Sequence, residues 1–268
     1  MYPAVEPIAS LPRDGDLYRV VGLGYALPPN SAAMWELEDV RGYNAMTFLR
    51  LAEVFPLFAS REEYWFNRVD RPSPFLDFLN VRYALAPAGT PWFPGWRKRA
   101  RGEGWELIEN ERYLPRAFVP RETRWGESDG ERLAALAAAT SFRRRAWLEP
   151  RSGPSPSPSV VPNDAGEVVS IDRRDAGYRL RTRFERPGWV VVSETAWRGW
   201  RAVAGGRELP LAFANHAFLA FEAPAGEQEI DLFFRPRSFE VGLAVSCACA
   251  LALAAAALTR RRRLSPSG

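Results

Sequence analysis

Cysteine and histidine are nearly absent from this chain of 268 residues. Cys247 and Cys249 are its two cysteines, and His216 is its single histidine. A fold held together by several disulfides is therefore excluded, and so are metal sites that need two or more imidazole ligands. We accordingly expect no metal ion, no cofactor and no catalytic centre built on a histidine cluster.

Charge of one sign is not in large excess either. The 36 basic residues, of which Lys98 is the one lysine, are interspersed with 32 acidic residues, so the formal net charge is only +4. A mild, mixed charge does not favour nucleic acid as a partner. Apolar residues make up 47% and aromatic residues 13% of the chain, which is typical of a folded protein and not of a disordered one.

The C-terminal region contains one long uncharged segment. Residues 241–258 lack charge and proline, and the four arginines 260–263 follow almost directly. A helix of this length rises about 27 Å, close to the thickness of a hydrocarbon core. We predict a transmembrane helix over residues 238–259, with the lipid bilayer as partner, and a basic tail over residues 260–268. A buried helix of a soluble core is the alternative.

The arginine run sets the expected orientation. Positive residues favour the cytoplasmic side of a membrane, so the tail would lie in the cytoplasm and residues 1–240 outside it. Residues 1–16 have neither the basic nor the apolar region of a signal peptide. Two interpretations remain: the C-terminal part of a longer membrane protein, or a tail-anchored protein with its bulk in the cytoplasm. The charge asymmetry favours the former.

Hydrophobic periodicity changes around the stretch 153–163. This stretch alternates proline with serine and predicts an exposed loop or linker. The pattern after it alternates in short strands and predicts an antiparallel β-sandwich over residues 165–237, with 144 as an alternative start. The expected strands are 178–184, 189–192, 199–204, 207–211, 217–223 and 228–235, with a Gly205–Gly206 turn in the middle.

The pattern upstream is mixed and predicts a small α+β domain over residues 1–125, followed by helix, strand and loop over residues 126–164. The expected helices are 43–55, a short one from Pro74, and 131–146. The expected strands are 17–21, 81–85, 105–109, 113–119 and 145–149. The predicted fold class is therefore α+β: a small mixed domain, then an antiparallel β-sandwich and one C-terminal transmembrane helix.

No segment carries a strong catalytic signature. Gly22 and Gly24 begin like a dinucleotide-binding loop, but Leu27 stands where the third glycine is needed and two prolines follow in place of a helix. His216 lies between two predicted strands, without the motif of a nucleophile elbow. The simpler interpretation of His216 is a turn residue whose ring nitrogens meet backbone or water, and the alternative is a general base.

Ligand-binding candidates are found in the predicted sandwich. They are Trp197, Arg198, Arg201, Asn215 and His216. Tryptophan faces beside arginine can bind sugar rings or headgroups, although tryptophans in a sandwich more often belong to the core. Period two predicts that Trp189 and Trp200 are mostly buried in the sandwich and that Trp197 is more exposed. Gly199, between them, predicts a backbone position that a side chain would disturb.

Three arginines stand beside apolar residues. They are Arg41, Arg82 and Arg116. We predict that at least one is mostly buried, and a buried arginine needs a carboxylate partner because an unpaired buried charge costs several kcal/mol. The expected partners are Glu38, Asp39 and Asp77.

Seven segments, in their order and spacing, resemble the C-terminal end of the YfhO family of bacterial membrane proteins. They are EDVRGY at 38–43, LDFLNVRY at 76–83, ENERYLPRAF at 109–118, SETAWRGWRAVAGGRELP at 193–210, AN at 214–215, PAGE at 224–227 and FFRPRSF at 233–239. The resemblance covers roughly residues 17–263. Two positions depart from it: Ala204 precedes the glycine turn where aspartate is usual, and Phe234 stands where tyrosine is common.

The resemblance implies a large, multi-spanning protein similar to GT-C glycosyltransferases, which take sugars from polyprenyl-phosphate donors outside the cytoplasmic membrane. In such proteins the catalytic carboxylates lie in loops between N-terminal helices, so no catalytic residue is assigned here. The chain would be the extracytoplasmic C-terminal portion with the last helix, and its partners would be other transmembrane helices and a glycan or lipid-linked sugar. The alternative is a non-enzymatic, single-pass envelope protein whose sandwich binds a glycan or a partner protein.

Overall fold

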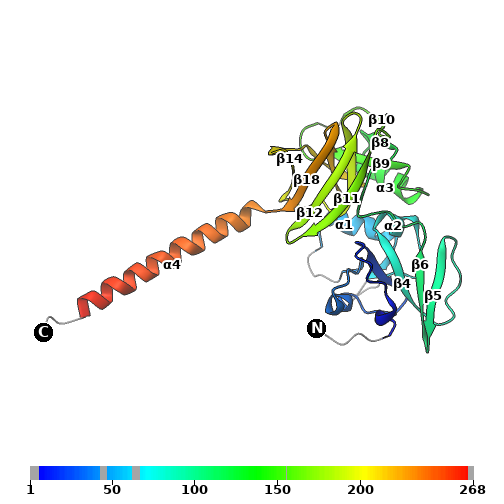
Figure 1. Cartoon of the computed structure of the whole chain (residues 1–268), viewed down its shortest axis with the longest axis horizontal. Coiled ribbons are helices and arrows are strands. Elements are labelled where there is room, and N and C mark those ends of the chain that lie inside the picture. The colour runs from blue at the N-terminus through cyan, green and yellow to red at the C-terminus, as the bar shows by residue number, and fades with distance from the viewer. Residues whose placement is uncertain (1–5, 43–46, 62–66, 155, 265–268) are drawn as a thin grey trace.

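The structure is a folded body of β-sheets with one long helix projecting from it (Figure 1). It is a computed structural model that describes residues 6–42, 47–61, 67–154 and 156–264. Sheets of four, seven and five strands form most of the body, and the helices between them are short. The predicted fold class, α+β with a β-sandwich and one C-terminal helix, is therefore confirmed.

The four-stranded sheet comes from the N-terminal part of the chain. Its strand order is β1-β4-β6-β5, with β1 and β4 parallel and the other neighbours antiparallel. The strands are β1 (Arg19–Gly22), β4 (Val81–Pro87), β5 (Trp96–Gly102) and β6 (Trp105–Asn110). A separate pair is formed by β2 (Ser60–Arg61) and β3 (Asn67–Arg68). This sheet supports the first of the two polar side-chain groups described below.

Two further sheets pack face to face as the sandwich. The seven-stranded sheet has the order β10-β8-β9-β16-β17-β13-β7, and the five-stranded sheet has the order β11-β12-β18-β14-β15. The first comprises β7 (Ala117–Phe118), β8 (Glu122–Trp125), β9 (Arg145–Pro150), β10 (Ser159–Pro162), β13 (Gly188–Thr195), β16 (Leu211–Ala214) and β17 (Phe218–Ala223). The second comprises β11 (Gly166–Arg174), β12 (Gly177–Phe184), β14 (Trp200–Ala204), β15 (Arg207–Glu208) and β18 (Gly226–Phe234).

Strand β13 separates two apolar cores. Val190 and Val192 face the five-stranded sheet, whereas Val191 faces the opposite side, where the helices and the N-terminal region pack. Trp189 shares the face of Val191, so the prediction that it is buried in the sandwich is wrong. It is partly buried in the other core, edge-on to Trp125 with ring centroids 5.1 Å apart. The period-two pattern predicted correctly which residues of this strand share a face. It did not predict which of the two cores each face meets.

The sandwich begins earlier in the chain than the expected start at 165 or 144. Its seven-stranded sheet takes in β7 and β8, and β8 pairs in parallel with β9. The stretch 153–163 is also not a loop throughout, because β10 pairs with β8. β10 is the edge strand of that sheet, which is where proline is tolerated because no ladder hydrogen bond is lost.

The expected strand 207–211 is divided between the two sheets. Arg207 and Glu208 pair with β14 as β15, and Leu211 begins β16 in the other sheet. Pro210 stands between them and lacks the amide hydrogen that a continuous ladder needs. The expected strand 113–119 is reduced to β7, because the Leu114 amide donates to the Asp77 carbonyl (2.9 Å) in place of a strand partner.

The short helix expected from Pro74 is confirmed, whereas the other two helices predicted before the C-terminus are shorter than expected. The helices of this part are α1 (Leu49–Val54), α2 (Pro74–Phe78) and α3 (Asp129–Ala137), with the 3-10 helices η1 (Ile8–Ser10), η2 (Ser31–Trp35) and η3 (Phe55–Leu57). Of the expected helix 43–55, residues 43–46 lie outside the described residues. The expected helix 131–146 ends at Ala137, because the carbonyls of Arg143 and Arg144 accept amide hydrogens from the chain entering β8.

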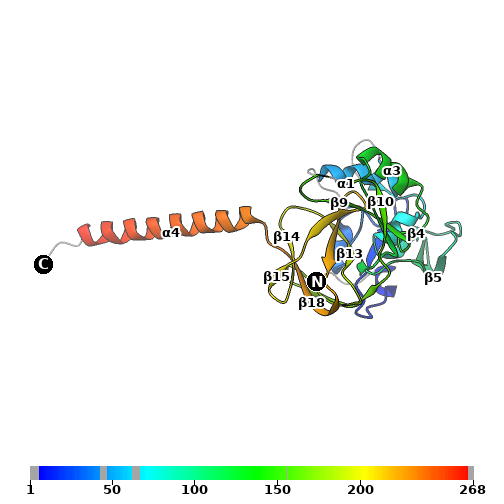
Figure 2. The same cartoon turned by 90° about the horizontal axis from the view of Figure 1, so that it is seen from above.

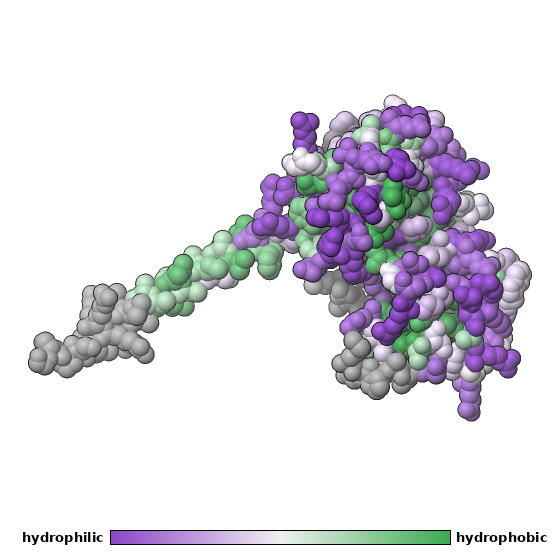
Figure 3. Space-filling model, in the orientation of Figure 1, coloured by the Kyte–Doolittle hydropathy of each residue, from purple (hydrophilic) through white to green (hydrophobic). Residues whose placement is uncertain are grey.

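Helix α4 (Arg237–Leu264) leaves the end of β18 and points away from the four-stranded sheet in both views (Figures 1 and 2). Its part Arg237–Ala256 has a mean hydropathy of 2.0 and none of it is buried against the body. Figure 3 shows this contrast, with an apolar helix beside a mostly hydrophilic body. The helix is therefore long and apolar enough to span a membrane, as the sequence predicts.

Candidate functional site

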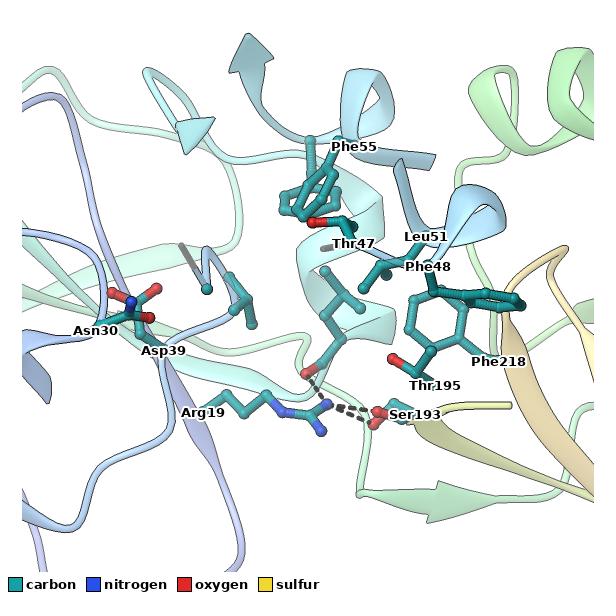
Figure 4. Close-up of a pocket in the computed structure, with 14 residues that line it drawn as sticks. Arg19, Asn30, Asp39, Thr47, Phe48, Leu51, Phe55, Ser193, Thr195 and Phe218 are labelled. Carbon is teal, nitrogen blue, oxygen red and sulfur yellow. Dashed lines mark hydrogen bonds between the residues drawn. The ribbon is translucent and has the colours of Figure 1, made fainter. Parts of the chain in front are cut away.

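A pocket of about 400 Å³ lies where the N-terminal region meets the seven-stranded sheet (Figure 4). We call it the central pocket. Its lining comes from β1, the chain around η2 and α1, η3, β13 and β17. The lining residues used below are Arg19, Asp39, Phe48, Ser193, Thr195 and Phe218. Its volume falls in the usual range for small-molecule sites.

Aromatic rings form the inner wall of the central pocket. Phe55, Phe58 and Phe218 are almost fully buried and belong to the larger apolar core. Phe48 is less buried and stands edge-on to the exposed ring of Trp197, with centroids 5.0 Å apart. A ligand in this pocket would therefore meet fixed apolar rings on one side.

Polar groups also line the central pocket. Ser193, which is buried, and Thr195 stand at the end of β13, and Figure 4 shows Thr195 beside the ring of Phe48. The Asp39 carboxylate is held by Arg41, whose guanidinium Nη2 lies 2.6 Å from Asp39 Oδ2. Arg41 is 1% exposed, so the prediction of a buried, carboxylate-paired arginine is confirmed. The pocket thus combines an apolar wall with hydroxyl and carboxylate groups of fixed orientation.

Arg19 links the central pocket to a network of buried ions. Its guanidinium donates to the Ser193 carbonyl at 2.6 Å and lies 2.9 Å from Glu194 and 3.2 Å from Glu38. Arg116 contacts the same two carboxylates, at 2.7 Å for Glu194 and 2.9 Å for Glu38. It is a second confirmed case of a buried, paired arginine, since its side chain is 0% exposed.

Burial and neighbouring charges shift the pKa values in this network in opposite directions. Burial, with repulsion from Arg116, lowers the pKa of Arg19 to about 10. Burial alone would raise the pKa of Glu194, but Arg19, Arg116 and hydrogen bonds from Tyr178 and Arg116 outweigh it and hold this pKa below the ordinary value. Glu194 therefore stays charged at neutral pH, and the network fixes β13 against the N-terminal region.

Arg82 is the third arginine that the sequence singles out. Its side chain is 14% exposed and lies 2.8 Å from Asp14, 3.0 Å from Asp16 and 3.4 Å from Glu109. None of these is among the expected partners. The N-terminal loop supplies two of them, which spacing along the sequence did not suggest.

His216 is fully buried behind the central pocket. Its Nε2 lies 2.6 Å from Oε2 of Glu53 on α1, and its Nδ1 lies 3.4 Å from Nε of Arg132. The interpretation as a residue between two strands is confirmed, but its ring nitrogens meet side chains and not backbone or water. Because Arg50 of α1 also pairs with Glu149 at 2.6 Å, these contacts hold α1, and with it the pocket wall, in place.

Asn215 is also buried and plays a structural part. Its Oδ1 accepts a hydrogen bond from the Trp147 amide at 3.1 Å, and its backbone has a φ of 46° in the turn between β16 and β17. Asn215 and His216 therefore stand apart from the other three predicted residues, and neither lines the pockets described here.

Trp197, Arg198 and Arg201 come together in a groove at the base of α4, which we call the helix-base groove. Its volume is about 570 Å³, and its lining residues are Trp197 to Arg201, Glu208, Arg235 to Ser238 and Glu240. Trp197 is 48% exposed, as predicted. Trp200 is partly buried against the sandwich core, with its ring 5.6 Å from that of Phe234.

Sequence reasoning missed the central pocket. Arg19, Phe48, Ser193 and Thr195 come from distant parts of the chain, and no motif groups them. The one available signal was Ser193-Glu194-Thr195, which breaks an otherwise apolar strand with three polar residues.

Comparison with known protein families, curated proteins and solved structures finds no match to this chain. Among the described residues, no group of three or more histidine, cysteine, aspartate or glutamate side chains could hold a metal ion. The geometry of the two pockets and of α4 is therefore the basis for a functional proposal.

Proposed function

We propose that the chain is the extracytoplasmic C-terminal portion of a YfhO-like, GT-C-type membrane glycosyltransferase, and that its central pocket holds one sugar ring of a cell-envelope glycan. The observation that carries the proposal is the pairing of an aromatic wall with hydroxyl and carboxylate groups in a pocket of about 400 Å³. A pyranose has an apolar face and a rim of hydroxyl groups, which match the aromatic rings and the polar groups of the lining.

The charge of the pocket supports an uncharged ligand. Asp39 is paired with Arg41, and Arg19 lies within 3.2 Å of both Glu38 and Glu194. A ligand with a full charge would have to break one of these pairs, whereas hydroxyl groups can add hydrogen bonds to them. The sugar would be presented on a polyprenyl phosphate or on the acceptor glycan, and the bond chemistry would belong to a membrane part outside this chain.

The position of α4 supports a site close to a membrane. Only two residues separate the end of β18 from the start of the helix, so the body cannot lie far from the bilayer surface. In this proposal the protein resides in the cytoplasmic membrane of a bacterium, with its body outside and the arginines 260–263 in the cytoplasm. Digestion of the body by protease added to spheroplasts supports this topology, and full protection contradicts it.

Binding of neutral saccharides to the full chain in non-ionic, sugar-free detergent micelles tests the pocket. We expect saturation transfer from the protein to hexoses and disaccharides. Thr195→Val removes one hydroxyl without changing shape, so it should weaken binding about fivefold, equivalent to about 1 kcal/mol for one hydrogen bond. Thr140→Val, at an exposed position remote from the pocket, is the control. Unchanged affinity in Thr195→Val, or no saccharide binding at all, contradicts the proposal.

The alternative is a non-enzymatic, single-pass envelope protein whose sandwich binds a glycan or a partner protein. It is favoured by the sandwich core, which is complete between its two sheets and is attached to one candidate membrane helix. The genomic sequence upstream of Met1 discriminates the two. An in-frame run of hydrophobic spans supports the transferase, and an immediate stop codon supports the single-pass protein.

A further inference from the structure

The helix-base groove carries more positive than negative charge. Its four arginines are Arg198, Arg201, Arg235 and Arg237, and its two carboxylates are Glu208 and Glu240. Glu208 accepts from Arg201 at 3.1 Å, and Glu240 lies 2.6 Å from Arg235. Both carboxylates are therefore already used by neighbouring arginines.

Arg198 and Arg237 are left without an acidic partner among the described residues. Both side chains are exposed. Another cation lies close to Arg198: Arg151 donates to the Trp197 carbonyl at 2.9 Å, and burial together with repulsion from Arg198 lowers the pKa of Arg151. Two guanidinium groups with no internal partner in one groove fit an external anion.

The loop that carries Trp197 and Arg198 is fixed to the start of α4. The Arg235 amide donates to the Gly199 carbonyl at 2.8 Å, and Trp200 Nε1 donates to the Thr195 carbonyl at 3.1 Å. Gly199 has a φ of 119°, and a Cβ there would lie 2.9 Å from Cα of Pro236. The expected need for a glycine is confirmed, and the contact places Trp197 and Arg198 at the base of the helix.

The aromatic residues around the groove indicate what kind of anion it meets. Trp197 is 48% exposed and Phe239, in the first turn of α4, is 66% exposed. Exposed aromatic rings beside arginine, at the end of an apolar helix, are typical of the headgroup level of a bilayer. An anion that reaches this level together with apolar chains is a lipid phosphate, and not a soluble one.

We propose that the helix-base groove binds the phosphate of an anionic phospholipid headgroup through Arg198 and Arg237, with Trp197 resting among the neighbouring headgroups. The site is separate from the central pocket and does not depend on its ligand. It would fix the body upright on α4, with the opening of the central pocket at a constant height above the membrane.

The test uses the full chain in neutral detergent micelles, titrated with dihexanoyl phosphatidylglycerol, dihexanoyl phosphatidylcholine or inorganic phosphate. We expect the phosphatidylglycerol to bind at least tenfold more tightly than either of the other two. In Arg198→Gln/Arg237→Gln the affinity for phosphatidylglycerol should fall about tenfold or more, because each arginine near an anionic headgroup contributes to the binding free energy. Arg207→Gln is the matched control, because Arg207 is exposed at the tip of the Gly205–Gly206 turn and outside the groove.

Each result decides the question. An unchanged preference for phosphatidylglycerol in the double variant overturns the proposal, and so does inorganic phosphate binding as tightly as the lipid, which would indicate a soluble anion site. If the double variant unfolds, Arg198→Gln alone replaces it and should lose about threefold or more. Loss of saccharide binding in Thr195→Val leaves this outcome unaffected, so failure of the two proposals can be told apart.

Discussion

Replacing Arg116 by methionine should destabilise the fold more than any surface substitution. Methionine keeps most of the apolar stem but removes the guanidinium, whose side chain is 0% exposed. The guanidinium donates to Asn80 Oδ1 at 3.1 Å, to the Tyr178 hydroxyl at 2.7 Å and to Glu194 Oε1 at 2.7 Å. It also lies 2.9 Å from Glu38, so one side chain connects the N-terminal region with both sheets of the sandwich.

The expected loss in the free energy of unfolding is about 3–5 kcal/mol, the usual cost of breaking a buried ion pair from one side. Arg19 remains beside Glu194 and Glu38, which keeps the value within that range and not above it. In Arg116→Met, Glu194 keeps Arg19 but loses its second arginine partner, so neutralising it in Arg116→Met/Glu194→Gln should recover at least about 1 kcal/mol relative to Arg116→Met.

Urea unfolding of the full chain in detergent micelles, followed by tryptophan fluorescence, measures these changes. Arg207→Met, at an exposed arginine, should stay within about 0.5 kcal/mol of the wild type. The pKa of Glu194 lies below its ordinary value of 4.5, so its contribution is full above that pH and is lost as the pH falls through the lower native value. A loss below about 1 kcal/mol for Arg116→Met, or strict additivity in the double variant, would refute the reasoning.

Two further predictions concern Asp77 and the tryptophans. Burial raises the pKa of Asp77 to about 6, so its charged form opposes folding and stability is lost as the pH rises from about 4 to 6. In urea unfolding, Asp77→Asn should thus raise the free energy of unfolding by up to about 3 kcal/mol over the wild type at pH 7 but by little at pH 4. The exposed control Asp164→Asn should show no such difference between the two pH values. Equal effects of Asp77→Asn at both pH values would contradict this reasoning. Trp200→Ala should cost about 3 kcal/mol as a cavity substitution, but Trp197→Ala less than about 0.5 kcal/mol, in thermal unfolding of the two variants. A larger loss of stability in Trp197→Ala than in Trp200→Ala would show that Trp197, and not Trp200, is packed against the core.

Local patterns predicted the strands of the five-stranded sheet well. Residues 178–184 alternate strictly, and β12 covers Gly177–Phe184, while the predicted 228–235 corresponds to β18 (Gly226–Phe234). Period two is visible within a few residues, so such strands need no information from distant parts of the chain. The split between β15 and β16 was not predictable in the same way, because it depends on which distant strand offers hydrogen-bond partners.

The candidate site was less predictable for the same reason. That at least one of Arg41, Arg82 and Arg116 would be buried followed from their apolar neighbours, and the partner Asp39 of Arg41 is two residues away. The pairing of Arg116 with Glu194 crosses 78 positions, and the contact of His216 with Glu53 crosses 163. Spacing along a single sequence carries no signal for such contacts, so the ion network and the central pocket became visible only in the fold.

Three of the segments from which a YfhO-like protein is predicted contribute to the same part of the structure, while the family itself stays a prediction. The segment 38–43 supplies Glu38 and Arg41, the segment 109–118 supplies Arg116, and the segment 193–210 supplies Glu194. These side chains form the buried ion network or hold the wall of the central pocket. Buried ion pairs need specific partners, so these residues are constrained by the fold itself. The three segments therefore meet at the joint between the N-terminal region and the sandwich, which is also where the central pocket lies.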